Sequence, residues 1–478
     1  MPDFGFIGAS YVAASPTQDD QECINYYPET DPTKQQGERG VVALYPCPGL
    51  IQKMQLPTTG AVRAMRVLPG SNILLAVAGS KLYSVNTAYS ATLVGTLLSD
   101  TGPVSITDNG ISAYLCDGSN RYYYTWGTST FAVVSDGAFT GANTVDVVDN
   151  YMIYNNPSSN QWGCTNVGSV VSGGLNFAST LAAPGNVIGL IADHRNVFLL
   201  GEKASEVWID VGSQPFPFGI LAGTNMQHGL AARGSVARLG ESFAFLSQDE
   251  RGKCVVVQMN GYSPNRISTH AVEQEISQYL VVSDAIAFTY QQAGHEFYML
   301  TFPTADKTWC FDLSTGLWHR RMWRDSNNIE HRHRANCAAF FNGDVIVGDY
   351  QNGAIYSFSL STFTDNGATI VGRRRCRHLT SELRRQFFSS LQIQFQPGTG
   401  IVTGQGSNPQ AMLRWSDDGG FTWSNEHWAA IGKIGQYKNR CIWRNLGQAR
   451  DRIFEVNVSD PVYRTIVSAE LNARPGAH

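Results

Sequence analysis

The chain lacks an apolar run approaching 18 residues, so we expect no membrane-spanning helix. Its start, MPDFGF, has neither a basic nor a long apolar stretch, which argues against a secretory signal. The nine cysteines include no C-x-x-C pair, and this favours free thiols over a disulfide framework. Charged residues are only 15% of the chain, and its net charge of -4 argues against a generic nucleic-acid-binding protein.

Helical periodicity is also scarce, and the best candidate for a helix is the single segment Thr269–Leu280. A different unit recurs instead: an apolar strand, a polar turn and an aromatic-rich strand. Seven copies begin at residues 73, 112, 152, 197, 243, 297 and 345. A period of roughly 40–50 residues is typical of a β-propeller with one four-stranded sheet per blade. The sequence therefore predicts an all-β fold with a propeller of six or seven blades.

The composition changes on either side of these repeats. Prolines punctuate the first segment at Pro16, Pro28, Pro32, Pro46 and Pro48. With little alternation around them, residues 1–54 are predicted to form an extended N-terminal arm that packs on something else. We expect the propeller over residues 55–368. In residues 369–478, strands such as Ile453–Val458 alternate apolar and polar side chains, which predicts a C-terminal antiparallel, β-sandwich-like domain.

One short run predicts a tight hairpin turn. Asp418-Gly419-Gly420 supplies the positive φ that such a turn needs, and the side chains of Ser416 and Asp418 can accept hydrogen bonds from its backbone N–H groups. Trp423 can pack the hairpin on the layer below. The spacing resembles the Asp-box turn of sialidase propellers and many other β-proteins, and its members here are Ser416, Asp418, Gly420, Thr422 and Trp423. The run carries no catalytic group, so we interpret it as architecture.

Candidate catalytic and metal-binding residues form no convincing set. A glycan-cleaving propeller needs paired carboxylates, yet no spacing singles out a pair among Asp193, Glu206, Asp210, Asp249 and Glu250. A zinc site is conceivable only with loose spacing, from Cys310, His319, His331, His333 and Cys337. The chain also lacks a phosphate-binding glycine loop. We therefore predict no enzyme activity, no metal and no cofactor, with a glycan-binding or glycan-hydrolysing propeller as the alternative.

Arginines gather in two clusters. The first consists of Arg320, Arg321, Arg324, Arg332 and Arg334. The second consists of Arg373, Arg374, Arg375, Arg377, Arg384 and Arg385, with only Glu382 opposing it locally. Arginine pairs with carboxylates and phosphates in bidentate fashion, so both clusters are candidates for contact with an acidic partner protein or a DNA backbone. A solvated loop and a linker are the alternative interpretation.

Short segments follow one another in a recognisable order along most of the chain. They are Ile24–Glu29, Tyr45–Leu50, Leu200–Gly201, Glu206–Trp208, Gln227–Ala231, Ser242–Ser247, Trp309–Asp312, Trp318, Val347–Asp349, Trp415–Asp418 and Trp443–Gly447. This order on a propeller-patterned chain resembles the packaged-DNA stabilisation proteins of short-tailed bacteriophages, which are hub or plug subunits of the tail.

The resemblance implies a structural virion protein that is assembled in the host bacterial cytoplasm and located in the virion tail. Its copies would form a ring, expected to be hexameric, that closes or extends the portal channel and retains packaged DNA. The implied partners are further copies of the chain, the portal adaptor (the head-to-tail connector), and tail fibres, spikes or a needle. Packaged double-stranded DNA would be contacted without sequence recognition, and no membrane is implied.

Overall fold

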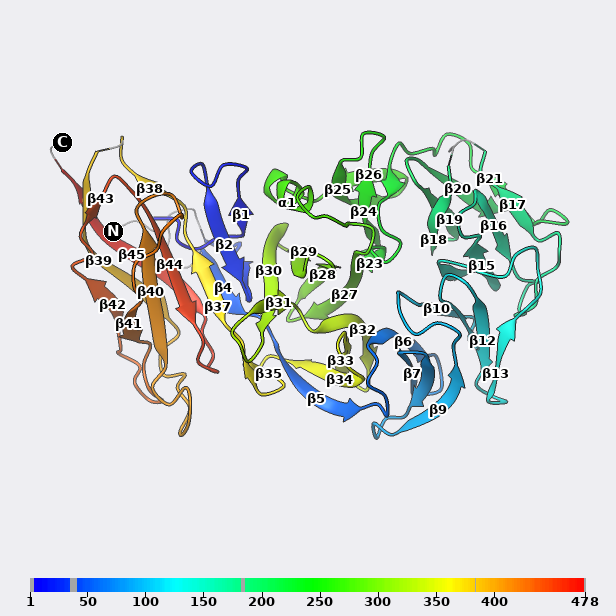
Figure 1. Cartoon of the computed structure of the whole chain (residues 1–478), viewed down its shortest axis with the longest axis horizontal. Helices are drawn as coiled ribbons and strands as arrows, with labels where there is room; N and C mark the ends of the chain where they lie inside the picture. The colour runs from blue at the N-terminus through cyan, green and yellow to red at the C-terminus, as the bar shows by residue number, and fades with distance from the viewer. Residues whose placement is uncertain (1–3, 35–40, 182–184, 383, 477–478) are drawn as a thin grey trace.

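The computed structural model describes residues 4–34, 41–181, 185–382 and 384–476. In these ranges almost every element is a β-strand, and the one helix is α1 (His270–Ile276). Figure 1 shows a ring of small sheets beside a two-layered domain, and both ends of the chain lie on the side of that second domain. The fold is therefore a propeller joined to a β-sandwich.

The described residues form seven blades. The first three are β6 (Val62–Leu68), β7 (Ile73–Ala78), β8 (Lys81–Val85) and β9 (Ala91–Thr96); β10 (Ser105–Asp108), β11 (Ser112–Cys116), β12 (Arg121–Thr125) and β13 (Thr130–Val134); and β14 (Val145–Val148), β15 (Tyr151–Asn155), β16 (Gln161–Cys164) and β17 (Phe177–Ser179). Blade four is β18 (Val187–Asp193), β19 (Asn196–Gly201), β20 (Ser205–Asp210) and β21 (Phe218–Ile220); blade five is β22 (Gly229–Leu230), β23 (Ala237–Leu239), β24 (Ser242–Gln248), β25 (Cys254–Asn260) and β26 (Ser263–Arg266). Blade six is β27 (Ile286–Gln292), β28 (His295–Phe302), β29 (Lys307–Asp312) and β30 (Leu317–Arg324), and β31 (Glu330–Arg332) pairs with β30.

Blade seven closes the ring with a strand from the other end of the chain. Three of its strands are consecutive: β32 (Ala335–Phe341), β33 (Asp344–Asp349) and β34 (Ala354–Ser359). The fourth is β5 (Gly49–Gln55), which pairs antiparallel with β34. Most of β5 belongs to the segment that the sequence assigns to the N-terminal arm. Because blades bury their faces only against neighbours, this strand exchange fastens the last blade to the start of the propeller.

The inner strands explain why the repeats are so apolar. Leu74, Leu75, Ala76 and Val77 of β7 are all fully buried, because neighbouring blades cover both faces of the sheet. Polar links join blades as well: Arg66 of blade one donates to Asp108 of blade two, with 2.8 Å between Nε and Oδ2.

Helix α1 connects blades five and six and is shorter than the predicted Thr269–Leu280. Thr269 caps it, since the Thr269 hydroxyl accepts from the Val272 N–H at 3.4 Å. After Ile276 the N–H groups of Gln278 and Tyr279 donate to carbonyls three residues back. The regular helix therefore ends at Ile276 and continues only as a tighter turn.

The sandwich is built by the C-terminal domain together with the arm. One sheet contains β2 (Asp20–Ile24), β37 (Gly372–Arg375), β44 (Asp451–Val458), β40 (Gln410–Ser416) and β41 (His427–Ala430), with β1 (Tyr11–Val12) and β38 (Leu379–Thr380) attached. The other contains β3 (Tyr26–Thr30), β4 (Val42–Pro46), β45 (Ile466–Pro475), β39 (Gln386–Phe395), β42 (Cys441–Arg444) and β43 (Gln448–Ala449). The short pair β35 (Thr364–Asp365) and β36 (Ala368–Thr369) flanks β5. Buried side chains of the two sheets, including Leu413, Leu391 and Leu44, form a common core.

The arm strand β2 makes the two domains continuous. It pairs in parallel with β30 of blade six and antiparallel with β37 of the sandwich, so a single sheet runs from one domain into the other. Figure 1 shows β2, β30 and β37 side by side between the domains. The arm gains its order by packing on its own chain.

Candidate interdomain and partner-binding sites

The predicted turn lies between β40 and β41, and its side chains bond as the spacing suggests. The Ser416 hydroxyl accepts from the Gly420 N–H at 2.8 Å. The Asp418 carboxylate accepts from the N–H and the hydroxyl of Thr422, at 2.9 and 2.6 Å. These bonds lower the pKa of Asp418 to about 2. Gly419 and Gly420 have φ values of 78° and 96°, a conformation that glycine adopts without the strain other residues would incur.

Trp423 connects this turn to the junction between the domains. It precedes β41, which begins only at His427. The guanidinium groups of Arg375 and Arg414 lie 4.8 and 4.7 Å from the centroid of its ring. The indole therefore packs on cations as well as helping to hold the turn, to which its Nε1 donates at the Gly420 carbonyl.

Three arginines of the second cluster are divided by the alternation of β37. Successive side chains of a strand point to opposite faces, so Arg373 and Arg375 share one face and Arg374 has the other. Arg373 forms an ion pair with Glu330 at 2.6 Å, and Arg375 forms ion pairs with Asp20 at 2.6 Å and Glu455 at 2.9 Å. These carboxylates come from the arm, the propeller and the sandwich, so the arginines join three distant parts of the chain.

Further ion pairs extend this arrangement into what we call the junction network. Its members are Asp20, Glu22, Arg320, Arg324, Glu330, Arg373, Arg375, Arg414 and Glu455. Glu22 of β2 lies at its centre, 3.4 Å from Arg320 and 3.2 Å from Arg375. Glu455 is fully buried and also pairs with Arg414 at 2.6 Å. Arg320, Arg373 and Arg375 of the basic clusters are thus paired with acids that are remote in sequence.

The protonation behaviour of the network follows from this pairing. Burial by itself would raise the pKa of Glu330, but Arg373 and Arg324 outweigh it and lower that pKa to about 2. The same competition, between burial and the guanidinium groups of Arg375 and Arg320, lowers the pKa of Glu22. For Asp20 burial prevails over Arg375 and the pKa is raised. Glu330 therefore holds its charge well into acid, and the pKa of Glu22 lies below its ordinary value.

Arg374 is fully buried on the opposite face of β37. Its guanidinium donates to the backbone carbonyls of Phe6 at 2.5 Å and Ala9 at 3.0 Å, and to the Gln21 side chain at 2.6 Å. It has no route to a phosphate or to another protein without local opening. Its observed role is to hold the first residues of the arm against the sandwich.

The first cluster is also engaged within the chain. Arg321 is buried and donates to the Tyr290 hydroxyl at 2.7 Å. The guanidinium of Arg332 stacks 3.9 Å from the Tyr350 ring centroid, and that of Arg334 stacks 3.7 Å from the Trp323 ring centroid. Arg321 is therefore inaccessible, and Arg332 and Arg334 are only partly exposed.

Three arginines of the second cluster are exposed: Arg377, Arg384 and Arg385. Arg384 pairs with Glu382 at 3.2 Å while remaining 59% exposed. Contact with DNA or a partner stays a prediction for both clusters, and these three residues are the members that could make it without rearrangement.

The remaining sequence candidates are the carboxylates considered for glycan cleavage and the residues considered for a zinc site. Glu206 is buried and accepts from the Trp208 Nε1, while Asp210 and Asp249 accept backbone N–H groups of turns. In the described ranges no three of the His, Cys, Asp and Glu side chains are arranged to hold a metal ion. His319 lies fully buried in β30, and His331 instead pairs with Asp306 at 2.8 Å.

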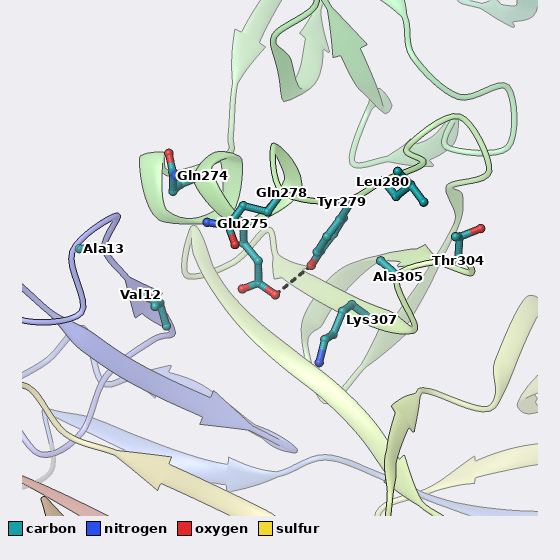
Figure 2. A pocket seen from close by; sticks show the side chains of 10 residues that line it. All are labelled: Val12, Ala13, Gln274, Glu275, Gln278, Tyr279, Leu280, Thr304, Ala305 and Lys307. Atoms are coloured by element: carbon teal, nitrogen blue, oxygen red, sulfur yellow. Dashed lines mark hydrogen bonds between the residues drawn. The ribbon is translucent and has the colours of Figure 1, made fainter. Parts of the chain in front are cut away.

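A cavity of about 520 Å³ lies where the arm meets the propeller. Figure 2 shows Val12 and Ala13 of the arm facing α1 across it, with Glu275 accepting from the Tyr279 hydroxyl at 2.9 Å. Burial lowers the pKa of Lys307 on its floor. The cavity separates two elements of the same chain.

A seven-bladed propeller, joined by a continuous sheet and by charge pairs to a sandwich that includes the arm, defines a two-domain β-protein. The family follows from the sequence models: the chain belongs to the bacteriophage P22 Gp10 family, whose beta-propeller model matches residues 17–363 and whose beta-sandwich model matches residues 374–474. It is therefore a Gp10-type structural protein of a phage. Along the described ranges no helix is long and apolar enough to cross a bilayer.

Solved structures resemble the chain more distantly, and no curated protein matches it. The "Crystal Structure of the N-terminal Domain of Nup159" is 11% identical with a TM-score of 0.42, covering 73% of this chain and 99% of that chain. A chain of the "Crystal Structure of Mitotic Checkpoint Complex" is 12% identical with a TM-score of 0.39, covering 69% of this chain and 95% of that chain. The two family models provide the assignment.

Proposed function

We propose that this protein forms a ring in the phage tail, six copies in the favoured arrangement, that extends or closes the portal channel. In that position it retains the packaged DNA and docks the portal adaptor on one side and fibres, spikes or a needle on the other. The role is structural, without catalysis. The family membership supports it, and the observation that carries it is a pair of unlike apolar surfaces at opposite ends of the long axis of the molecule.

The first surface is on the propeller, in the loop between β16 and β17, where Val167 and Leu175 are 62% and 67% exposed. The second is on two sandwich loops, where Val402 and Tyr437 are 78% and 72% exposed. The ring of Tyr437 lies against Gly398, so these two loops meet. Figure 1 places β17 and β42 at opposite ends of the long axis. Different surfaces at the two ends suit the repeated heterologous contacts of a closed ring.

The junction network supports the same role mechanically. A ring that holds DNA under pressure must transmit force between its domains, and a continuous sheet with buried ion pairs resists their separation. DNA retention then needs no sequence recognition, because a closed channel blocks the chain physically. Within the two arginine clusters, Arg377, Arg384 and Arg385 are the exposed members that could contact phosphate.

The test is the mass of the purified protein, measured alone and then with the portal–adaptor complex of its own phage. A six-fold assembly, free or formed only on that complex, is the expected result. The double variant Val402→Ser with Tyr437→Ser should weaken assembly, while Leu93→Ser, at an exposed apolar residue of β9, serves as the control. A strict monomer in both settings would overturn the proposal.

A further inference from the structure

A groove of about 690 Å³, lined by both apolar and polar side chains, crosses from blade four to blade five of the propeller. Its walls are the turn between β18 and β19, the turn between β23 and β24, and the turn between β25 and β26 with the start of β26. Leu313 of blade six also lines it. The volume is typical of sites for small organic ligands, which are usually about 300–1,000 Å³.

Several side chains in this groove have unused hydrogen-bonding capacity. The Glu241 carboxylate and the amides of Asn260 and Asn265 are exposed there. Within the described ranges none of these three side chains forms a hydrogen bond or ion pair. A primary amide offers two donors and an acceptor, and a carboxylate offers acceptors only. Together they match a ligand whose groups both donate and accept.

One aromatic ring stands among these polar groups. Tyr262 is 42% exposed, and one side of its ring leans on Phe198, with centroids 6.2 Å apart. The support fixes the ring while leaving apolar surface open to the groove. Its hydroxyl is also free of partners among the described residues. A supported, amphipathic ring next to hydrogen-bonding groups can stack on a ligand that has an apolar face and a polar edge.

We propose that this groove binds an uncharged oligosaccharide. The ring faces of pyranoses are apolar and their edges carry hydroxyls that donate and accept, which is the combination that Tyr262, Asn260, Asn265 and Glu241 meet. Charge argues against an anionic ligand, because Glu241 is unpaired and Arg238 beside the groove is already bound to Asp146 at 3.2 Å. The site shares no residue with either apolar surface of the proposed ring, and it stands whether or not the ring forms.

The experiment is a titration of the full chain with neutral oligosaccharides that contain glucose, galactose, mannose, rhamnose or N-acetylhexosamine. Binding is measured by calorimetry and by saturation-transfer NMR. At least one should bind, and Tyr262→Ala should weaken its binding about tenfold, corresponding to the loss of one stacked ring. Tyr262→Phe should keep most of the affinity. Phe340→Ala, which removes an exposed aromatic ring from β32 of blade seven, is the control and should bind as the wild type does.

Circular dichroism establishes that each variant is folded, and Asn265→Ala gives a second probe of the groove. Binding that is lost in Tyr262→Ala and reduced in Asn265→Ala supports the assignment. It is overturned if no neutral oligosaccharide binds, or if Tyr262→Ala binds as well as Phe340→Ala.

Discussion

The side chain of Asn25 forms two reciprocal hydrogen bonds with the backbone of Met322: its Nδ2 donates to the Met322 carbonyl at 3.0 Å, and its Oδ1 accepts from the Met322 N–H at 3.1 Å. Nδ2 also donates to the Val371 carbonyl at 2.9 Å. Asn25 has φ 55°, a conformation that asparagine tolerates better than most residues. One amide therefore turns the arm from β2 into β3 and binds it to both domains.

Replacing that amide by a carboxylate should destabilise the protein. In Asn25→Asp one oxygen can still accept from Met322, but the other faces two carbonyls in a buried site. We expect a loss of about 2–4 kcal/mol of unfolding free energy, measured by thermal or urea unfolding. The control is Asn86→Asp, because the exposed Asn86 uses only its Oδ1, as acceptor from Ala88 and Ser90. Equal stability of the two variants would contradict this account.

Removing Arg374 should also unfold or loosen the arm. Arg374→Ala leaves the carbonyls of Phe6 and Ala9 without a donor and opens a cavity, at a cost of about 3 kcal/mol or more. Arg384→Ala should cost less than about 0.5 kcal/mol, since this residue is exposed and its ion pair is a surface one. Hydrogen–deuterium exchange of residues 4–12 provides the measurement. Unchanged protection in Arg374→Ala would show that the guanidinium does not hold the arm.

The junction network predicts a loss of stability in acid. The pKa of Glu330 is lowered to about 2 from its ordinary 4.5, so its stabilising contribution is present above about pH 4.5 and disappears as the pH falls towards 2. Glu330→Gln should therefore be less stable than the wild type at pH 7, and the difference should vanish near pH 2. Thermal midpoints measured across this range test it, with the exposed Glu382→Gln as control. A difference that is independent of pH would assign the effect to packing.

His295 predicts the opposite trend at higher pH. A hydrogen bond with Asp312 raises its pKa above the ordinary 6.5, against the effect of burial, and Glu29 of the arm raises it further. The stabilisation is thus complete below about pH 6.5 and is lost as the pH rises through the folded-state pKa. His295→Gln should abolish this alkaline decline in the thermal midpoint, whereas the exposed His270→Gln should keep it. A decline that persists unchanged in His295→Gln would exclude this histidine as its source.

Sequence patterns could predict the fold because their cause is local. The repeated apolar strands record burial on both faces, and the Ser416–Trp423 turn depends on bonds within eight residues. The junction network could not be predicted in this way. Arg373 and Arg375 form a basic run in the sequence, and nothing near them indicates that Glu22, Glu330 and Glu455 will lie beside them. Alternation along β37 could have placed Arg374 on the face opposite Arg373 and Arg375. Its hydrogen-bond acceptors could not be predicted, because backbone carbonyls of the arm leave no signal in the sequence.

The sequence by itself determined the β-rich class, the propeller period, the Asp-box-like turn and the resemblance that the family models confirm. These features arise from side-chain patterning and backbone preferences over a few residues. Only the tertiary structure decided how the ring closes and which charges meet. The pairing of β5 with β34, and of Glu22 with Arg320 and Arg375, joins residues some 300 positions apart, and such contacts are selected by the burial of whole sheets, which no local window of sequence encodes.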